Sequence, residues 1–237
     1  MSHVKTMQAF GKLKGICTGL GGAYNPGQQN LQVKVLTTLQ FNAQQLMDEV
    51  IEAKTAYDNI TNRRELAFRD VRSLGSRICY ELRSCGTHPL TLADAIASNR
   101  KLQGRTRYRT PEPMPQEGEA VNKRKGHPKD FASMVQYFAQ LVETASAEPF
   151  YRPVAEELTV ESLEQKVVEL RSLNELVMKA ELKLSQLYKQ RNAVLYEDEN
   201  SLVKIGRAVR HHIRATFGFR SAPHEELIKV SLTKPYR

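Results

Sequence analysis

Five basic side chains along residues 201–223 are spaced by threes and fours, which places them on one face of a helix. They are Lys204, Arg207, Arg210, His211 and Arg214, and no Asp or Glu lies between Ser201 and Pro223. Cations at this spacing can contact the phosphates of a nucleic acid without reading its bases. Because no DNA- or RNA-reading motif accompanies this stripe, a solvated basic face is the simpler interpretation.

More cations lie between residues 104 and 128, a stretch with four prolines, three glycines and almost no aliphatic side chains. This composition predicts a basic, flexible linker. Its candidate anion or nucleic-acid contacts are Arg105, Arg107, Arg109, Lys123, Arg124 and Lys125.

Other residue types that could do chemistry are not grouped. The six histidines form no HxxxH or ExxH pair, so we expect no metal site. The glycines at 19, 21 and 22 match neither a P-loop nor a dinucleotide fingerprint, and no GxSxG occurs. We therefore predict that the protein is not an enzyme and binds no cofactor.

Compartment and partner class follow from composition. The chain has 237 residues, a net charge of +9 and three cysteines. Cys79 and Cys85 lie six residues apart on a predicted helix, about 9 Å along its axis and too far to bridge. We expect buried, inert thiols in a reducing compartment. Without a signal peptide or a membrane-spanning apolar stretch, the sequence favours a cytoplasmic protein.

The elements that position these side chains are predicted by an internal repeat. Residues 31–67 align without a gap with residues 158–194, pairing leucines, valines and one arginine per copy, Arg64 with Arg191. Each stretch carries a heptad seam of apolar residues and contains no Gly or Pro, which predicts one long helix of roughly 50 Å. For the matched arginines we favour interaction with the helix C-terminus over an anionic partner.

Shorter helices are predicted around each long one. One precedes it, with Phe10 or Phe138 on its apolar face, and two follow. In the first repeat, the first helix that follows should begin at Ser73 and end at Gly86, with Arg83 in its last turn. In the second repeat it should begin at Ser201 and end at Gly218, with Arg214 in its last turn.

The fold class is therefore predicted as all-α: an internally duplicated antiparallel helical bundle with two long heptad-patterned helices and pseudo-twofold symmetry. Repeat 1 covers residues 1–103, the linker 104–128 and repeat 2 129–237. We expect the repeats to share one bundle, because one long helix with short neighbours covers little surface alone.

The plan resembles uncharacterised two-repeat helical proteins of Bacteroidetes-type bacteria. The residues that carry this resemblance are VKTMQAFGKLK (4–14), AKTAYDNITNRRELAF (53–68), RNAVLY (191–196) and FGFRSAP (217–223). The resemblance implies a bacterial all-helical protein. Since that family has no established activity, no functional residue transfers from it.

Two functions remain from different classes. The first is a non-enzymatic helical scaffold or protein-interaction protein that binds a protein partner or itself, which the heptad seams favour. The alternative is sequence-independent nucleic-acid binding through the stripe on repeat 2 and the linker. Because the repeats differ most on their surfaces, a specific function is expected where they disagree.

Overall fold

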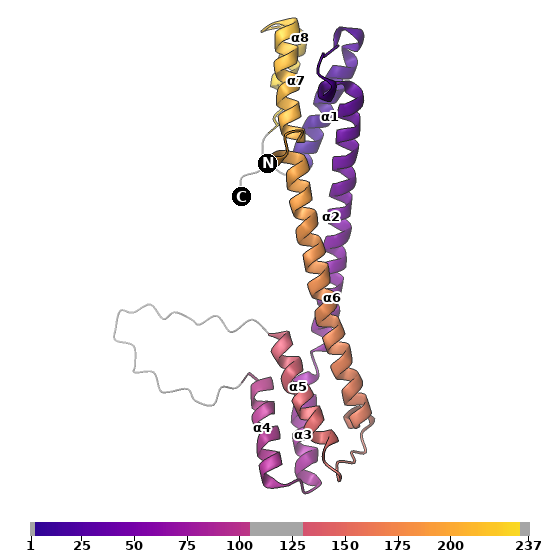
Figure 1. Cartoon of the computed structure of the whole chain (residues 1–237), viewed down its shortest axis with the longest axis vertical. Coiled ribbons are helices and arrows are strands. Elements are labelled where there is room, and N and C mark those ends of the chain that lie inside the picture. The colour runs from indigo at the N-terminus through magenta and orange to yellow at the C-terminus, as the bar shows by residue number, and fades with distance from the viewer. Residues whose placement is uncertain (1–2, 105–129, 233–237) are drawn as a thin grey trace, which may run out of the picture. The chain divides into compact units, whose positions relative to one another are not determined.

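The computed structural model describes residues 3–104 and 130–232, and within these ranges every regular element is a helix. This confirms the all-α prediction. The helices are α1 (His3–Gly19), α2 (Val33–Ala67), α3 (Val71–Ser84), α4 (Pro89–Leu102), α5 (Phe131–Ser146), α6 (Val160–Asn192), α7 (Leu202–Phe217) and α8 (Ala222–Ile228) (Figure 1). Short helical turns also occur, namely η1 (Gly21–Ala23), η2 (Gln29–Leu31), η3 (Glu156–Leu158) and η4 (Ala193–Glu197).

Two helices are much longer than the others, as the uninterrupted heptad seams predict. α2 has 35 residues and α6 has 33, so each extends about 50 Å at 1.5 Å per residue. Each begins two residues inside the predicted boundary, because a turn of 3-10 helix precedes it. α6 ends at Asn192 and continues as the π-helical turn η4, whereas the prediction extended the helix to Val194.

The chain divides into two compact units, and each takes segments from both predicted repeats. Unit 1 consists of Met1–Tyr57 and Glu181–Arg237, and unit 2 consists of Asp58–Ala180. Both long helices therefore contribute one part to each unit. The division into repeats 1–103 and 129–237, and the single bundle they were expected to share, stay predictions.

In unit 1, α1 packs against α7 and α8. Phe10 and Leu13 of α1 and Ile213 of α7 are completely buried, and burial of one such side chain contributes about 1.5–3 kcal/mol to stability. α2 and α6 contact each other in a separate small cluster of Val50, Ala53, Leu184 and Leu187. Val50 and Ala53 belong to the apolar seam of residues 31–67, and Leu184 and Leu187 to that of residues 158–194, so these seam residues are buried as the heptad pattern predicts.

In unit 2, α3, α4 and α5 pack against one another (Figure 1). The core of this unit includes the completely buried Ile78 and Phe138. α3 also carries Gly75, where an added Cβ would lie 2.6 Å from Leu102 and 3.3 Å from Leu141. The absence of a side chain there allows α3 to approach α4 and α5 closely.

The predicted starts of α3 and α7 have different outcomes. Ser201 occupies the N-cap of α7 as predicted, although its buried hydroxyl makes no hydrogen bond. The prediction of Ser73 as a helix start is wrong, because α3 already begins at Val71 with Asp70 at the N-cap. The Asp70 carboxylate pairs with Lys166 at 3.6 Å and suits the positive end of the helix dipole. Gly86 and Gly218 end their helices with φ values of 76° and 88°.

The cysteines were expected to be buried, and two of the three are. Burial raises the pKa of the Cys17 thiol to about 11 and also raises that of Cys79, so both thiols stay protonated at neutral pH. Cys85 is only half-buried, which corrects the prediction for that residue. It lies at the C-cap of α3, where its Sγ lies 3.3 Å from the carbonyl oxygen of Leu82.

Candidate nucleic-acid interface

α7 separates its apolar and basic side chains onto different faces. Its buried residues Ile205, Val209 and Ile213 recur at intervals of four and face the core of unit 1. The exposed residues among the predicted stripe are Lys204, Arg207, His211 and Arg214, which recur at intervals of three, four and three. These spacings put the four side chains on one surface of the helix, away from the core.

The positive charges on this surface are largely uncompensated. Neither Arg207 nor Arg214 forms an ion pair with any carboxylate of the residues that the structure describes. The Lys204 ammonium donates a hydrogen bond to the backbone carbonyl of Glu197 at 2.7 Å, which orders the side chain without neutralising it. The face can therefore attract a polyanion.

Arg210 differs from the other cations of α7, because it is half-buried. Its Nε and one terminal nitrogen are buried and have no hydrogen-bond partner among residues 3–104 and 130–232. Burial, together with the nearby charge of Arg207, lowers the pKa of the Arg210 guanidinium. Arg210 therefore lies at the margin of the predicted stripe, and its guanidinium is less accessible to a ligand than those of Arg207 and Arg214.

The loop that follows α7 extends this surface. Phe219 is 61% exposed, and the Arg214 guanidinium lies over its ring at 4.8 Å from the centroid. The buried His224 of α8 contacts the same ring, with 5.2 Å between the ring centroids. Phe219 was not predicted from the sequence, although it lies between a helix-ending glycine and an arginine in FGFRSAP.

Arg220, the next residue, has an uncommon backbone conformation. Its φ is 74°, and it is the one non-glycine residue with positive φ in the described ranges. Such a conformation costs roughly 1 kcal/mol or more and persists where the surrounding structure imposes it. Here the Ser221 hydroxyl donates to the carbonyl of Gly218 at 2.9 Å and closes the loop. The exposed Phe219 and Arg220 are thus held by an ordered turn.

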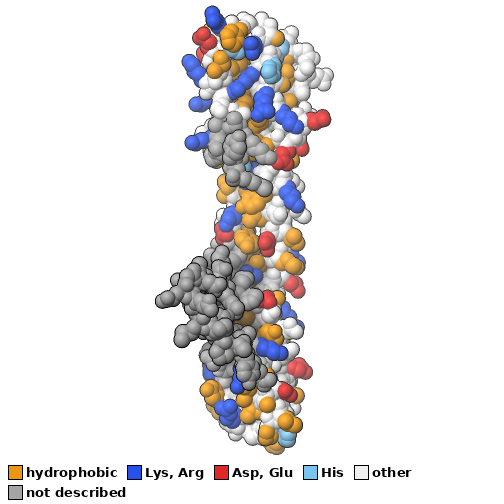
Figure 2. Space-filling model, turned by 90° about the vertical axis from the view of Figure 1, so that its left-hand side faces the viewer, with side chains coloured by type: hydrophobic (Ala, Val, Ile, Leu, Met, Phe, Trp, Pro, Cys, Tyr) orange, Lys and Arg blue, Asp and Glu red, His pale blue; other side chains and the backbone are white. Residues whose placement is uncertain are grey.

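Charge is distributed unevenly between the two units. The described part of unit 1 contains 14 Lys and Arg against 9 Asp and Glu, whereas that of unit 2 contains 12 against 14. Figure 2 shows Lys and Arg side chains gathered over the region of α7 and α8, with fewer carboxylates among them. A polyanion is therefore attracted to unit 1 more strongly than to the described surface of unit 2.

The linker candidates cannot be placed on this surface. Arg105, Arg107, Arg109, Lys123, Arg124 and Lys125 all lie outside the described residues.

The matched arginines of the long helices stack on aromatic rings. The Arg64 guanidinium lies 4.2 Å from the centroid of Phe131, and that of Arg191 lies 4.9 Å from the centroid of Tyr188. Arg191 also donates to the side-chain oxygen of Asn192, whereas Nε of Arg64 is buried without a partner. Both arginines lie in the last turns of their helices, where a cation suits the helix dipole, and the ring contacts add a packing role.

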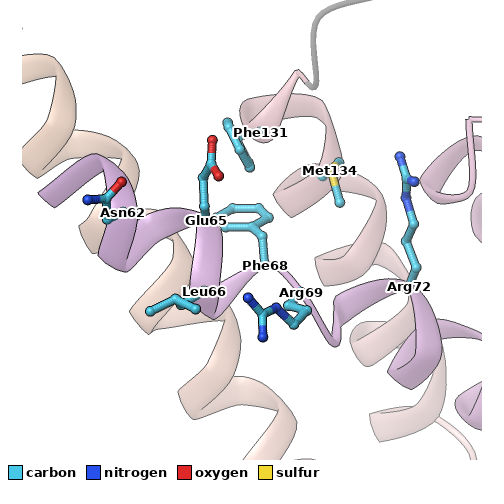
Figure 3. Close-up of a pocket in the computed structure, with 8 residues that line it drawn as sticks. All are labelled: Asn62, Glu65, Leu66, Phe68, Arg69, Arg72, Phe131 and Met134. Carbon is cyan, nitrogen blue, oxygen red and sulfur yellow. The ribbon is translucent and has the colours of Figure 1, made fainter. Parts of the chain in front are cut away.

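Unit 2 contains an open pocket of about 480 Å³ near the end of α2 (Figure 3). Its apolar lining includes Phe68, Phe131 and Met134. Arg69, in the turn before α3, and Arg72, in α3, also line it. Neither arginine is in an ion pair among the described residues. Glu65 is the one carboxylate among its described lining residues, which include no Ser, Cys or His.

No group of three or more His, Cys, Asp or Glu residues in the described ranges is arranged to hold a metal ion. None of the helices in those ranges is both long enough and apolar enough to cross a bilayer.

Comparison of the chain with protein-family models, curated proteins and solved structures found no match.

Proposed function

We propose that the protein binds nucleic acid without sequence specificity through the exposed basic face of α7, and that it catalyses no reaction. One observation carries this proposal: Arg207 and Arg214 are exposed and form no ion pair within the described residues, on a helix with no carboxylate from Ser201 to Pro223. Each cation that contacts a phosphate releases condensed counterions, which favours binding at low salt. The excess of cations in unit 1 supports the same conclusion.

The internal duplication with its pseudo-twofold relation is part of the proposal. Equivalent contacts in the two units support it. The Tyr24 hydroxyl donates to the carbonyl of Leu31 at 2.8 Å, and the Tyr151 hydroxyl donates to that of Leu158 at 3.0 Å. In unit 1, Gly206 faces the side chain of Leu232 as Gly75 faces that of Leu102 in unit 2.

On this view, the two copies share a framework and differ in surface charge. α3, the proposed counterpart of α7, contains Glu81. Its Arg77 forms an ion pair with Glu157 at 2.5 Å. A carboxylate on the helix and another beside it reduce the attraction of this face for phosphate. Nucleic-acid binding is accordingly assigned to unit 1.

Charge reversal tests the proposal. The double variant Arg207→Glu and Arg214→Glu places two carboxylates on the face and leaves the half-buried Arg210 in place. We expect wild-type binding to a labelled oligonucleotide to weaken with salt, with a log–log slope of about −2 to −3 for three or four phosphate contacts. The double variant should lose binding by at least about a hundredfold at low salt.

The matched control reverses two exposed arginines of unit 2, Arg63 and Arg171, and so changes the net charge of the protein equally. This control should bind nearly as well as wild type. Equal loss of binding in both variants would show that only net charge matters. Wild-type protein that binds no DNA or RNA at low salt would refute the proposal.

Self-association is a second candidate function, supported by large apolar side chains exposed on the long helices of unit 1. Phe41 and Ile51 of α2 are 60% and 61% exposed, and Leu182 of α6 is 58% exposed. Sedimentation analysis over a range of protein concentrations tests this candidate. A dimer that dissociates when Phe41 and Ile51 are replaced by Ser would support it, whereas a monomer at all concentrations would exclude it.

A further inference from the structure

We infer that the loop between α7 and α8 is a stacking platform, so that the protein prefers single-stranded over double-stranded nucleic acid. This inference rests on the proposed function and specifies its ligand. The platform consists of the Phe219 ring with the guanidinium groups of Arg214 and Arg220.

The exposure of Phe219 is the first argument. A phenylalanine ring at a helix end ordinarily gains stability by burial, yet 61% of this residue remains exposed. The contacts with Arg214 and His224 hold the ring in place without covering it. An ordered, exposed ring loses little conformational entropy when a flat ligand stacks on it.

The charges beside the ring are the second argument. Arg214 belongs to the basic face of α7, and Arg220 follows Phe219 directly, so the ring is continuous with a surface that attracts phosphates. Single-strand binding proteins combine these two features, because unpaired bases stack on aromatic rings while cations follow the backbone. In a duplex the bases are already stacked on each other, and only the phosphates remain for the basic face.

The corresponding loop of unit 2 provides a contrast. Between α3 and α4 the chain runs through Gly86, Thr87 and His88. Thr87 is buried, and the exposed His88 caps α4 through its ring nitrogen, so this loop contains no Phe, Tyr, Trp or Arg. A connection between the two helices therefore does not require the Phe-Arg pair. In unit 2 the last-turn Arg83 stacks instead on Tyr80 of α3 itself, at 5.7 Å from the ring centroid, so the Phe-Arg loop is a feature of unit 1.

Fluorescence anisotropy of the full-length protein tests the inference. The probes are a labelled oligothymidylate of about 20 nucleotides, longer than typical single-strand site sizes, and a mixed-sequence duplex of the same length. The variants are Phe219→Ala, Phe219→Leu and Phe219→Tyr. The matched control is Phe150→Ala, since Phe150 is 71% exposed in unit 2.

Wild-type protein should bind the single strand more tightly than the duplex. Phe219→Ala and Phe219→Leu should weaken single-strand binding about tenfold and leave duplex binding within about twofold, since only stacking is removed. Phe219→Tyr and Phe150→Ala should behave as wild type. Because Phe219→Leu keeps an apolar side chain against His224, it decides the question if the alanine variant is poorly folded.

Four results would overturn the inference. Equal wild-type affinity for both probes would exclude stacking, and so would unchanged single-strand binding in Phe219→Leu. In either case the proposed function would still stand if charge reversal at Arg207 and Arg214 abolished binding. Equal weakening of both probes by Phe219→Leu would mean that the residue supports the loop without contacting bases. Absence of wild-type binding to either probe would refute both proposals.

Discussion

At the scale of single residues, the cations of α7 differ in what surrounds them. Arg207 and Arg214 project from the exposed face, whereas two nitrogens of Arg210 are buried without hydrogen-bond acceptors. A buried, unsatisfied donor costs roughly 1–3 kcal/mol, and more when it is charged. Arg210 therefore lowers the stability of unit 1, and it contributes little to the basic face of α7.

This difference leads to a prediction for Arg210→Met, which retains an apolar stem and removes the unpaired donors. The free energy of unfolding should stay equal or rise by about 1 kcal/mol. Urea denaturation measures it, with Arg207→Met as the exposed control, which should change stability by less than about 0.5 kcal/mol. A clear loss of stability in Arg210→Met would mean that Arg210 has an acceptor when the protein is folded.

At the scale of elements, close helix contacts depend on single glycines. Gly75 lies inside α3, where a Cβ would be 2.6 Å from Leu102 and 3.0 Å from the Asn99 side chain. Gly15 lies on the exposed side of α1, with nothing within 4 Å of its added Cβ. The same substitution should therefore have opposite effects at the two positions.

We predict that Gly75→Ala lowers the free energy of unfolding by about 1–3 kcal/mol, because the methyl group overpacks the contact of α3 with α4. Gly15→Ala should raise it by up to about 1 kcal/mol, the usual gain in an exposed helix. Thermal unfolding followed by circular dichroism compares the variants. Stabilisation by both substitutions would contradict the close contact at Gly75.

Most elements could be predicted from the sequence, since their signals are local. The heptad seams without Gly or Pro predicted α2 and α6, and Gly86 and Gly218 marked helix ends. The start of α3 was missed, because Asp70 is as suitable a cap as Ser73 and alignment with Ser201 favoured the latter. The buried part of Arg210 was also missed, since helical spacing does not reveal how far a neighbouring segment covers one side of a face.

At the scale of the whole molecule, each unit depends on both halves of the chain. The core of unit 1 combines α1 with α7 and α8, and that of unit 2 combines α3 and α4 with α5. Periodicity identifies the apolar face of each helix but not the helix against which it packs. The sequence alone therefore could not predict that each unit combines helices from both halves of the chain.

Because each unit contains helices from both halves of the chain, we can predict the result of cutting the chain between α4 and α5. A specific protease site inserted among residues 105–128 should yield two polypeptides that remain one species in gel filtration, because separation would expose both cores to water. The same sample should separate in denaturant, and the parent chain without the site serves as the control. Two folded fragments that elute apart in native buffer would contradict the arrangement of the units.

The central claim concerns where nucleic acid binds, and photocrosslinking tests it most directly. A photoreactive oligothymidylate is bound to the full-length protein at low salt and irradiated, and crosslinked peptides are identified by mass spectrometry. The account predicts crosslinks within residues 202–220, with Phe219 among the modified positions, and their loss in the Arg207→Glu and Arg214→Glu variant. Crosslinks confined to peptides of unit 2, or unchanged in that variant, would contradict it.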